Sequence, residues 1–377
     1  MKDHSSPWID VGVHRLPMQS PDDVSELENL LQSQAIQADT IVGIIAQTEG
    51  TGYARGYTSL CLQLLLSQFL NCSREAVFAR IPLMMIGLCG GLMSPHYTVF
   101  TRSSVAAPVT PPQEKRLTVG VANTRDLFPE EYGTPLQVQL VGDAVRAAIT
   151  DAGITDLEDV HCVEIKCPAM TPNRLQDATA RGVTVISTNL GQASSFSKAA
   201  SALGIGVAVG EIAPDSIRAE AINHNPDLYT NRGSVSAGGE QSACRVLVMG
   251  NATHSLSPYR IGHGVMQDQL DLQGVINALN SAGLSCALPL TAGQQQQITQ
   301  LLINCGADAQ SSVRGRRHTI HSDFLSGYAG IMAKTVANAV VAAVVGDPMI
   351  LASAGNEHQG APGSNLVAAI IQRSKVT

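Results

Sequence analysis

Two short stretches of this chain are nearly identical: Ser236-Ala237-Gly238-Gly239-Glu240 and Ser353-Ala354-Gly355-Asn356-Glu357. A related stretch, Cys89-Gly90-Gly91-Leu92-Met93, lies in the first third of the chain. The three stretches are separated by on the order of a third of the chain, so the repeating unit is a domain and not a short solenoid repeat. Together they predict three similar domains.

Each third of the chain also begins with an amphipathic helix that leads into a β-branched strand. Apolar residues recur at spacings of three and four in the segments 22–35, 142–152 and 271–282, as one buried helix face requires. The predicted strands are 40–46, 160–165 and 298–303, and each is followed by a polar residue: Gln47, Lys166 or Asn304. Two further small-residue helices, within 201–211 and 335–347, close on a Gly-acid pair.

These repeats predict an α/β protein made of three similar α+β domains. The proline-rich segment 107–115 is polar and suits a linker. We therefore expect domains at 1–105, 117–252 and 253–377, with a linker at 106–116. If the domains surround a pseudo-threefold axis, their strand ends meet at one central cavity.

Composition excludes several classes of function. The net charge is −7, which argues against a nucleic-acid surface despite the basic run at 314–318. The apolar runs are too short to span a bilayer, and the N-terminus has no signal pattern. The eight cysteines are scattered without a CxxC pair, so a zinc site is not expected. We expect a cytoplasmic protein with reduced thiols and no membrane partner.

The second domain carries the residues that suggest catalysis. A serine is a weak nucleophile until a base removes its proton, and a lysine can be that base when burial lowers its pKa. Lys166 follows a predicted buried strand, and Ser236 opens a predicted glycine-rich turn. Spacing alone favours an ordinary strand end and turn, but the repeat strengthens the catalytic interpretation because the same two positions stand out in each third.

Several motifs resemble those of the cyanuric acid hydrolase/barbiturase family of ring-opening amidohydrolases. In chain order they are SPH at 94–96 after Gly90-Gly91, EIKCP at 164–168, SALG at 201–204, VRGRRHT at 313–319, and EHQG at 357–360 with Pro362-Gly363. They extend from about residue 48 to residue 364. The chain is therefore identified as a divergent member of that family.

The resemblance implies three like domains around a pseudo-threefold axis, called the Toblerone fold, and hydrolytic opening of a cyclic imide or ureide. It implies three Ser-Lys pairs around the substrate, of which the second-domain pair attacks. Carried over, Lys166 is the base and Ser236 the nucleophile, while main-chain N–H groups, including that of Ala237, hold the attacked carbonyl. It implies no organic cofactor and a homo-oligomer, a tetramer as in relatives. The resemblance also implies a structural divalent metal near Asn356–Ser364, bound largely through main-chain carbonyls; its acidic ligand is not located in this sequence, so a metal there stays open and is not a prediction.

The chain also departs from the family pattern. Gln47 and Asn304 stand for the first and third lysines, Cys89 for the first serine, and Ser353 is retained. The arginine of each domain is replaced by Ser59, by Lys198, and by Lys334 or Ile331. Cys89 is interpreted as a small buried substitute for serine, with a redox or covalent role as the alternative. The expected substrate-binding residues are Gln47, Cys89, Gly90, Ala237, Lys198, Asn304, Ser353 and Ala354.

These departures favour a ring less symmetric than cyanuric acid, because an amide in place of lysine removes a cation. His96, His318 and His358 are expected to form structural hydrogen bonds. Two alternatives to ring-opening hydrolysis stay open: a biosynthetic enzyme that runs acyl transfer or cyclisation on the same fold, and a non-catalytic relative that binds a small cyclic ligand.

Overall fold

Three sheets of four strands form the centre of the molecule. The computed structural model describes residues 7–50, 52–306, 309–320 and 327–373. The first sheet has the order β1 (Ile9–Pro17), β4 (His96–Ser104), β2 (Ile41–Gln47), β3 (Leu83–Ile86). The second has β5 (Arg116–Asn123), β8 (Arg245–Ala252), β6 (Val160–Pro168), β7 (Gly233–Gly238). The third has β9 (Tyr259–Met266), β14 (Asn365–Gln372), β10 (Ile298–Cys305), β13 (Leu351–Ala354).

The three sheets share one topology, which confirms the predicted fold of three similar α+β units. In each, the first, last, second and third strands of the unit lie side by side in that order. The second and third strands are parallel, and the last strand is antiparallel to its neighbours. The strands of the three sheets lie within 9–104, 116–252 and 259–372. We keep 1–105, 117–252 and 253–377 as our proposed division, whose outer ends lie outside the described residues.

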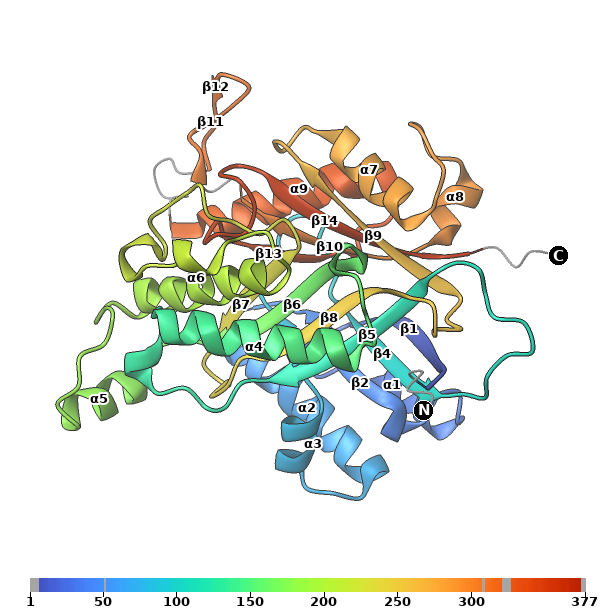
Figure 1. The fold of residues 1–377 in the computed structure, drawn as a ribbon, viewed down its shortest axis with the longest axis horizontal. Helices are drawn as coiled ribbons and strands as arrows, with labels where there is room; N and C mark the ends of the chain where they lie inside the picture. The colour runs from blue at the N-terminus through green and yellow to red at the C-terminus, as the bar shows by residue number, and fades with distance from the viewer. Residues whose placement is uncertain (1–6, 51, 307–308, 321–326, 374–377) are drawn as a thin grey trace.

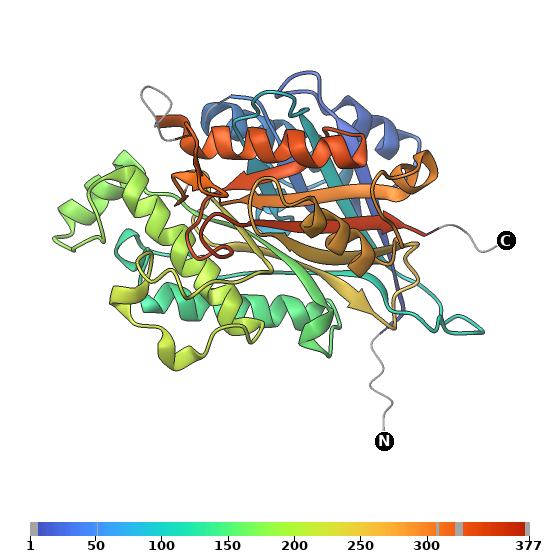
Figure 2. The ribbon, with the colours of Figure 1, turned by 90° about the horizontal axis from the view of Figure 1, so that it is seen from above.

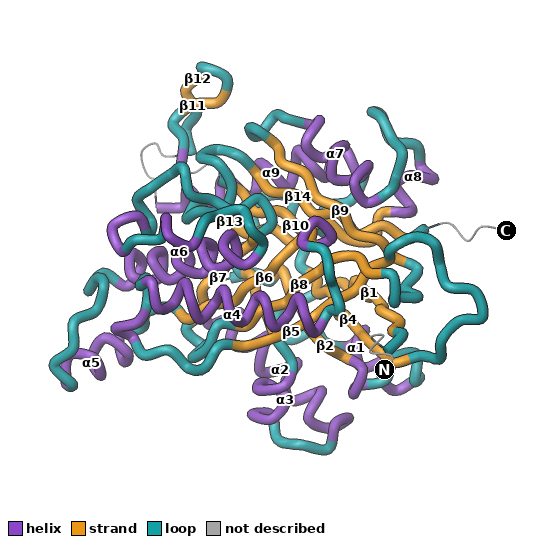
Figure 3. Tube along the Cα trace, viewed as in Figure 1, coloured by secondary structure: helices purple, strands orange, loops and turns teal. Residues whose placement is uncertain are grey.

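Helices cover the outer face of each sheet (Figure 1). They are α1 (Ser25–Gln32), α2 (Gly52–Leu70) and α3 (Arg74–Arg80) in the first unit, and α4 (Pro135–Asp151), α5 (Pro172–Ala180) and α6 (Leu190–Ala208) in the second. The third unit has α7 (Leu272–Ala282), α8 (Ala292–Gln297), α9 (Ala329–Val345) and the hairpin β11 (Ser312–Val313) and β12 (Arg316–Arg317). Seen from above, the strands lie between the orange-red helix α9 and the green helix α4 (Figure 2), and helices occupy the periphery (Figure 3).

Each sheet buries both faces. On β6, Val163, Ile165 and Cys167 belong to the core beneath the second unit's helices, whereas Cys162 belongs to a central core built from all three sheets. This alternation follows from strand geometry, because successive side chains point to opposite faces. The inner faces therefore pack together along the centre of the molecule, where polar side chains must find partners.

Glycines allow helices to approach the sheets closely. A Cβ on Gly120 of β5 would lie 2.0 Å from the main-chain oxygen of Ala148 in α4. A Cβ on Gly262 of β9 would lie 2.1 Å from the main-chain nitrogen of Ala282 in α7. The first strands of the second and third units are thus packed against their helices in the same way.

The predicted helices and strands are all present, although their bounds differ: β2 includes Gln47, and β10 continues through Asn304 to Cys305. Strand β6 continues through Lys166 to Pro168, and Ser236 lies within strand β7 and not in a turn. The reason is the parallel pairing of β6 with β7, which gives the backbone around Ser236 a ladder partner despite the following glycines. None of the helices in the described ranges is long and apolar enough to cross a membrane.

Candidate active site

Lys166 and Ser236 lie opposite each other near the carboxyl ends of β6 and β7. Lys166 Nζ donates a hydrogen bond of 3.1 Å to Ser236 Oγ and one of 2.7 Å to the main-chain oxygen of Met85 on β3. The lysine is fully buried. These contacts hold the amine against the hydroxyl whose proton a base must remove.

The surroundings of Lys166 favour its neutral form. Burial lowers the pKa of the Lys166 ammonium to about 8. The carboxylate of Glu240 opposes this change, and the cations of Arg55 and Lys334 reinforce it. At pH 7 a pKa of about 8 leaves about a tenth of the amine unprotonated, far more than for a free lysine, and this fraction can act as a general base.

A cavity of about 330 Å³ opens beside the pair and is lined by all three units. From the second unit come Lys198, Ser236 and Ala237. The first and third units contribute Arg55, Ile86, Gly87 and Leu88, and Gly327, Tyr328, Gly330, Ile331, Lys334, Ser353 and Ala354. The structure thus brings Lys198, Ala237, Ser353 and Ala354, as expected, to the same cavity as the Ser-Lys pair.

Three cationic side chains from three helices border this cavity. Arg55 lies on α2, Lys198 on α6 and Lys334 on α9. Lys198 forms an ion pair with Glu357, and Lys334 donates to the main-chain oxygen of Gly87. Burial lowers the pKa of Lys334 to about 8.

The expectation that Ser59 replaces the first arginine is wrong. Ser59 is buried and accepts a hydrogen bond from Gln63 Nε2 within α2. Arg55, one helical turn earlier, reaches the cavity instead. Arg55 and Ser59 lie one turn apart on the same face of α2, so the sequence pattern does not distinguish them. Only the placement of α2 along its axis in the fold decides which of the two reaches the cavity.

The position equivalent to Ser236 in the first unit is Ile86, not Cys89. Gln47 pairs with Ile86, just as Lys166 pairs with Ser236 and Asn304 pairs with Ser353. Cys89 lies three residues beyond the end of β3 and packs against the core of the third unit. Its side chain is hydrogen-bonded to Gln47, and burial raises the pKa of its thiol. Cys89 is thus a poor nucleophile in this setting.

Four of the expected substrate-binding residues do not line the cavity. Gln47 is buried, and its Oε1 accepts a 2.8 Å hydrogen bond from the main-chain nitrogen of Ala352 in the third unit. Asn304 Nδ2 donates to the main-chain oxygen of Gly355. A Cβ on Gly90 would lie 2.6 Å from Thr335 Oγ1 on α9. Gln47, Cys89 and Gly90 thus connect the first unit to the third, whereas Asn304 bonds within the third unit.

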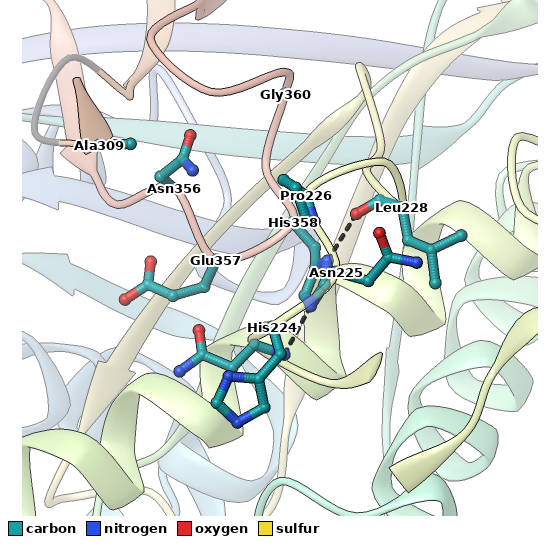
Figure 4. Close-up of a pocket in the computed structure, with 10 residues that line it drawn as sticks. His224, Asn225, Pro226, Leu228, Ala309, Asn356, Glu357, His358 and Gly360 are labelled. Carbon is teal, nitrogen blue, oxygen red and sulfur yellow. Dashed lines mark hydrogen bonds between the residues drawn. The ribbon is translucent and has the colours of Figure 1, made fainter. Parts of the chain in front are cut away.

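A second cavity of about 350 Å³ lies where a loop of the second unit meets the segment after β13 (Figure 4). His358 lies between the two: its Nδ1 donates to the main-chain oxygen of Leu228 at 2.5 Å, and its Nε2 accepts from the main-chain nitrogen of Asn223 at 2.7 Å. Both ring nitrogens are thus used in the structural role expected. Glu357 lines this cavity and reaches Lys198 of the first cavity.

The loop 356–364 holds the oxygen atoms that a structural metal there would use. Asn356 Oδ1 is buried without a hydrogen-bond partner among the described residues, so one oxygen is available. The main-chain oxygens of Ala361, Pro362 and Ser364 already accept protein hydrogen bonds. In the described parts of the chain, no three His, Cys, Asp or Glu side chains could together hold an ion.

The fold and site define an α/β protein with a buried Ser-Lys pair at a cavity among three like units. Comparison with known proteins identifies the family. A family described as "Amidohydrolase ring-opening protein" matches residues 12–372. The chain belongs to this family.

Individual relatives match over nearly the whole chain. The cyclic amide hydrolase of Azorhizobium caulinodans is 40% identical over 366 residues, covering 96% of this chain and 99% of that protein. Barbiturase 1 of a Nocardioides species is 35% identical over 368 residues, covering 96% and 98%. A solved cyanuric acid hydrolase superposes with a TM-score of 0.91 at 34% identity, covering 97% of this chain and all of that one. The predicted family and fold are confirmed.

Proposed function

We propose that this protein hydrolyses a C–N bond of a cyclic amide, imide or ureide, with Ser236 as the nucleophile and Lys166 as its base. The observation that carries the proposal is the 3.1 Å contact between Lys166 Nζ and Ser236 Oγ at the edge of the cavity. Membership of the ring-opening family supports the reaction class. The lowered pKa of Lys166 supports the assignment of the base.

The proposed reaction has two halves. Lys166 takes the hydroxyl proton as Ser236 Oγ attacks a ring carbonyl, and main-chain N–H groups such as that of Ala237 stabilise the oxyanion. The C–N bond breaks, Lys166 gives its proton to the ring nitrogen, and an ester with Ser236 remains. Water then attacks this ester while Lys166 accepts the water proton and returns a proton to Ser236, which releases the opened product.

The cavity favours a substrate without threefold symmetry. Ser236 has a lysine partner, Ser353 faces an asparagine, and the equivalent position in the first unit is the apolar Ile86. A ring with one reactive carbonyl and an apolar edge fits these three unlike positions better than a ring with three like carbonyls. We propose a substituted pyrimidinedione, hydantoin, cyclic imide or lactam.

The test is hydrolysis by the purified protein across cyanuric acid, barbituric acid, hydantoins, cyclic imides and lactams. Ser236→Ala and Lys166→Ala should abolish turnover of the best ring. Ser353→Ala, which removes the corresponding hydroxyl of the third unit, should change KM and retain turnover. Turnover by Ser236→Ala would refute the mechanism, and cyanuric acid as the best ring would refute the proposed substrate class.

We also propose that the protein is a homo-oligomer. Tyr53, Tyr57 and Leu64 of α2 are exposed and lie on one helix face, and an exposed apolar stripe of this kind suits an interface. Sedimentation velocity should show an assembly that Tyr57→Glu weakens, and a monomer at all concentrations would contradict it. A cytoplasmic location stays a prediction from the sequence.

A further inference from the structure

Three equivalent positions of the sheets border one cavity. Ser236, Ser353 and Ile86 occupy the same place in the second, third and first units, and all three line the cavity beside Lys166. The second unit bonds the first, the first bonds the third, and the third bonds the second. This closed circuit of like units spaces the three positions a third of a turn apart, as alternate atoms of a six-membered ring are spaced.

The cationic side chains do not distinguish these three positions. Among the described residues, each unit contributes one to the cavity: Arg55 from α2, Lys198 from α6 and Lys334 from α9. The units differ instead at the equivalent strand position, which carries a hydroxyl in the second and third units and only carbon in the first. A hydroxyl can donate to a ring carbonyl, whereas a hydrocarbon side chain cannot. The selectivity of the cavity therefore depends on what Ile86 accepts.

Ile86 cannot hydrogen-bond a ring oxygen through its side chain. The residue is 5% exposed, and its main-chain oxygen accepts a 2.7 Å hydrogen bond from the main-chain nitrogen of Thr48. The main-chain nitrogens of Leu88 and Cys89 donate to the main-chain oxygens of Gly50 and Thr48 at 3.1 and 3.3 Å, so these two donors are engaged within the first unit. A ring carbonyl directed at Ile86 would exchange its hydrogen bonds to water for contact with carbon, which is unfavourable.

Two further apolar side chains border the cavity near the first unit. Leu88 follows β3 by two residues with a φ of 66°, a left-handed conformation that is unusual for leucine, and its hydrogen bond to Gly50 holds it there. Ile331 of α9 lies against the same segment, since a Cβ on Gly90 would be 3.4 Å from its Cγ2. Both residues line the cavity together with Ile86. Strand, loop and helix thus form one apolar wall between the first and third units.

We propose that Ile86 is the specificity-determining residue of this site. The substrate is a six-membered ring with two carbonyls on either side of one nitrogen, directed at Ser236 and Ser353, and with a saturated carbon, bare or alkylated, directed at Ile86. Cyclic imides of the glutarimide type and dihydropyrimidinediones have this pattern, whereas cyanuric acid and barbituric acid would place a third carbonyl at the apolar wall. This inference rests on the proposed ring-opening function and narrows its substrate class.

The test uses two rings that differ at one of these three positions: dihydrouracil has a methylene where barbituric acid has its third carbonyl. The wild type should favour dihydrouracil in kcat/KM. Ile86→Ser should shift the ratio of the two rings by about tenfold or more towards barbituric acid, because the new hydroxyl can donate to the third carbonyl. Each ring is compared between the two proteins, so the different acidity of the rings cancels. Glutarimide, which also has a methylene at this position, should respond to Ile86→Ser as dihydrouracil does.

Cys89→Ser is the matched control. It places a serine at the position that the glycine motif favours but that does not line the cavity, so the ratio should stay as in the wild type. Ile86→Thr keeps a β-branched side chain in β3 and adds a hydroxyl, so it should shift the ratio in the same direction and decides the question if Ile86→Ser fails to fold. An unshifted ratio in folded Ile86→Ser or Ile86→Thr, or an equal shift in Cys89→Ser, overturns the proposal.

A binding measurement separates this inference from the mechanism. Calorimetric titration of Ser236→Ala with the same rings measures affinity without turnover, and Ile86→Ser in that background should shift the ratio of the two dissociation constants in the same direction. Turnover by Ser236→Ala would refute the Ser236 mechanism, and the ratios would still decide the role of Ile86. A wild type that prefers barbituric acid, or that binds neither dihydrouracil nor glutarimide, overturns the inference even if the Ser236 mechanism holds.

Discussion

Replacing Lys166 by methionine should inactivate the protein and make it more stable at neutral pH. Methionine has a similar volume and no charge, so the core should remain filled. Burial lowers the pKa of Lys166 from 10.5 to about 8, a difference that corresponds to about 3 kcal/mol at about 1.4 kcal/mol for each unit. This is the free energy by which the fold disfavours the ammonium at pH 7.

The loss of the bond to Met85 opposes this gain. An unpaired buried carbonyl costs about 1–2 kcal/mol, which leaves a net stabilisation of about 1–2 kcal/mol. Unfolding entropy is about 2 cal/mol/K for each residue, so for 377 residues the expected rise in Tm is about 2 °C.

The pH dependence of this stability difference identifies its cause. A lysine whose folded pKa is depressed binds fewer protons in the native state between pH 8 and pH 10.5, so the wild type gains stability across that window. The advantage of Lys166→Met should be largest below pH 8, vanish between about pH 9 and pH 10, and reverse by about pH 10.5, where only the loss of the bond to Met85 remains. Denaturant unfolding of both proteins at pH 7 and at pH 10 measures this difference in the free energy of unfolding. A variant that is less stable than the wild type at pH 7, or a stability difference that does not change with pH, would refute a lowered pKa for buried Lys166.

Three further variants test other parts of the structure. Gly120→Ala should lower the free energy of unfolding by about 1–3 kcal/mol, because the new methyl group overlaps the main chain of α4. Thermal melts should show a correspondingly lower Tm. Gln47→Leu should lower the free energy of unfolding by about 1–3 kcal/mol because the main-chain nitrogen of Ala352 loses its acceptor, whereas Gln47→Glu, which keeps an acceptor oxygen, should lose less in the same denaturant titration. Glu357→Gln removes the anion that holds Lys198, so KM should rise severalfold with a smaller change in kcat, and equal changes in both would contradict a binding role.

The repeat and the Lys166–Ser236 pair could be predicted because both are written locally in the sequence. Helix and strand periodicity repeats in each third, and the pair sits in specific motifs. The register of the first unit could not be predicted in this way. Cys89 resembles the serine position through its following glycines, yet Ile86 pairs with Gln47, because the hydrogen-bonded ladder and not the glycine motif fixes which residue faces the centre.

Contacts between units were also beyond the sequence. Gln47 was expected to meet substrate, but its amide bonds a strand of the third unit. Glu357 was part of a motif, but nothing in the sequence links it to Lys198, which is far away along the chain. Such pairings depend on the packing of whole units, so a pattern within one unit carries no signal for them.

The contacts between units account for the amide side chains of Gln47 and Asn304 at the two positions equivalent to Lys166. Lys166 of the second unit bonds Met85 of the first, and Gln47 of the first unit bonds Ala352 of the third. Met85 and Ala352 are equivalent, since each directly precedes the residue that pairs with the central polar side chain. At these two junctions, therefore, the side chain in the lysine position holds the next unit, and glutamine does so as well as lysine.

At the third junction, between the second and third units, a side chain also bonds the main chain of the neighbouring unit, but it comes from another position. The equivalent of Met85 in the second unit is Val235, and its main-chain nitrogen donates at 2.6 Å to Gln359 Oε1 and not to Asn304. Asparagine is shorter than lysine or glutamine, and its Oδ1 remains without a partner among the described residues. Holding the units together thus requires a hydrogen-bonding side chain at each junction, whereas removing a serine proton requires an amine at only one. This difference in chemical demand accounts for an amine at Lys166 and amides at the two equivalent positions, Gln47 and Asn304.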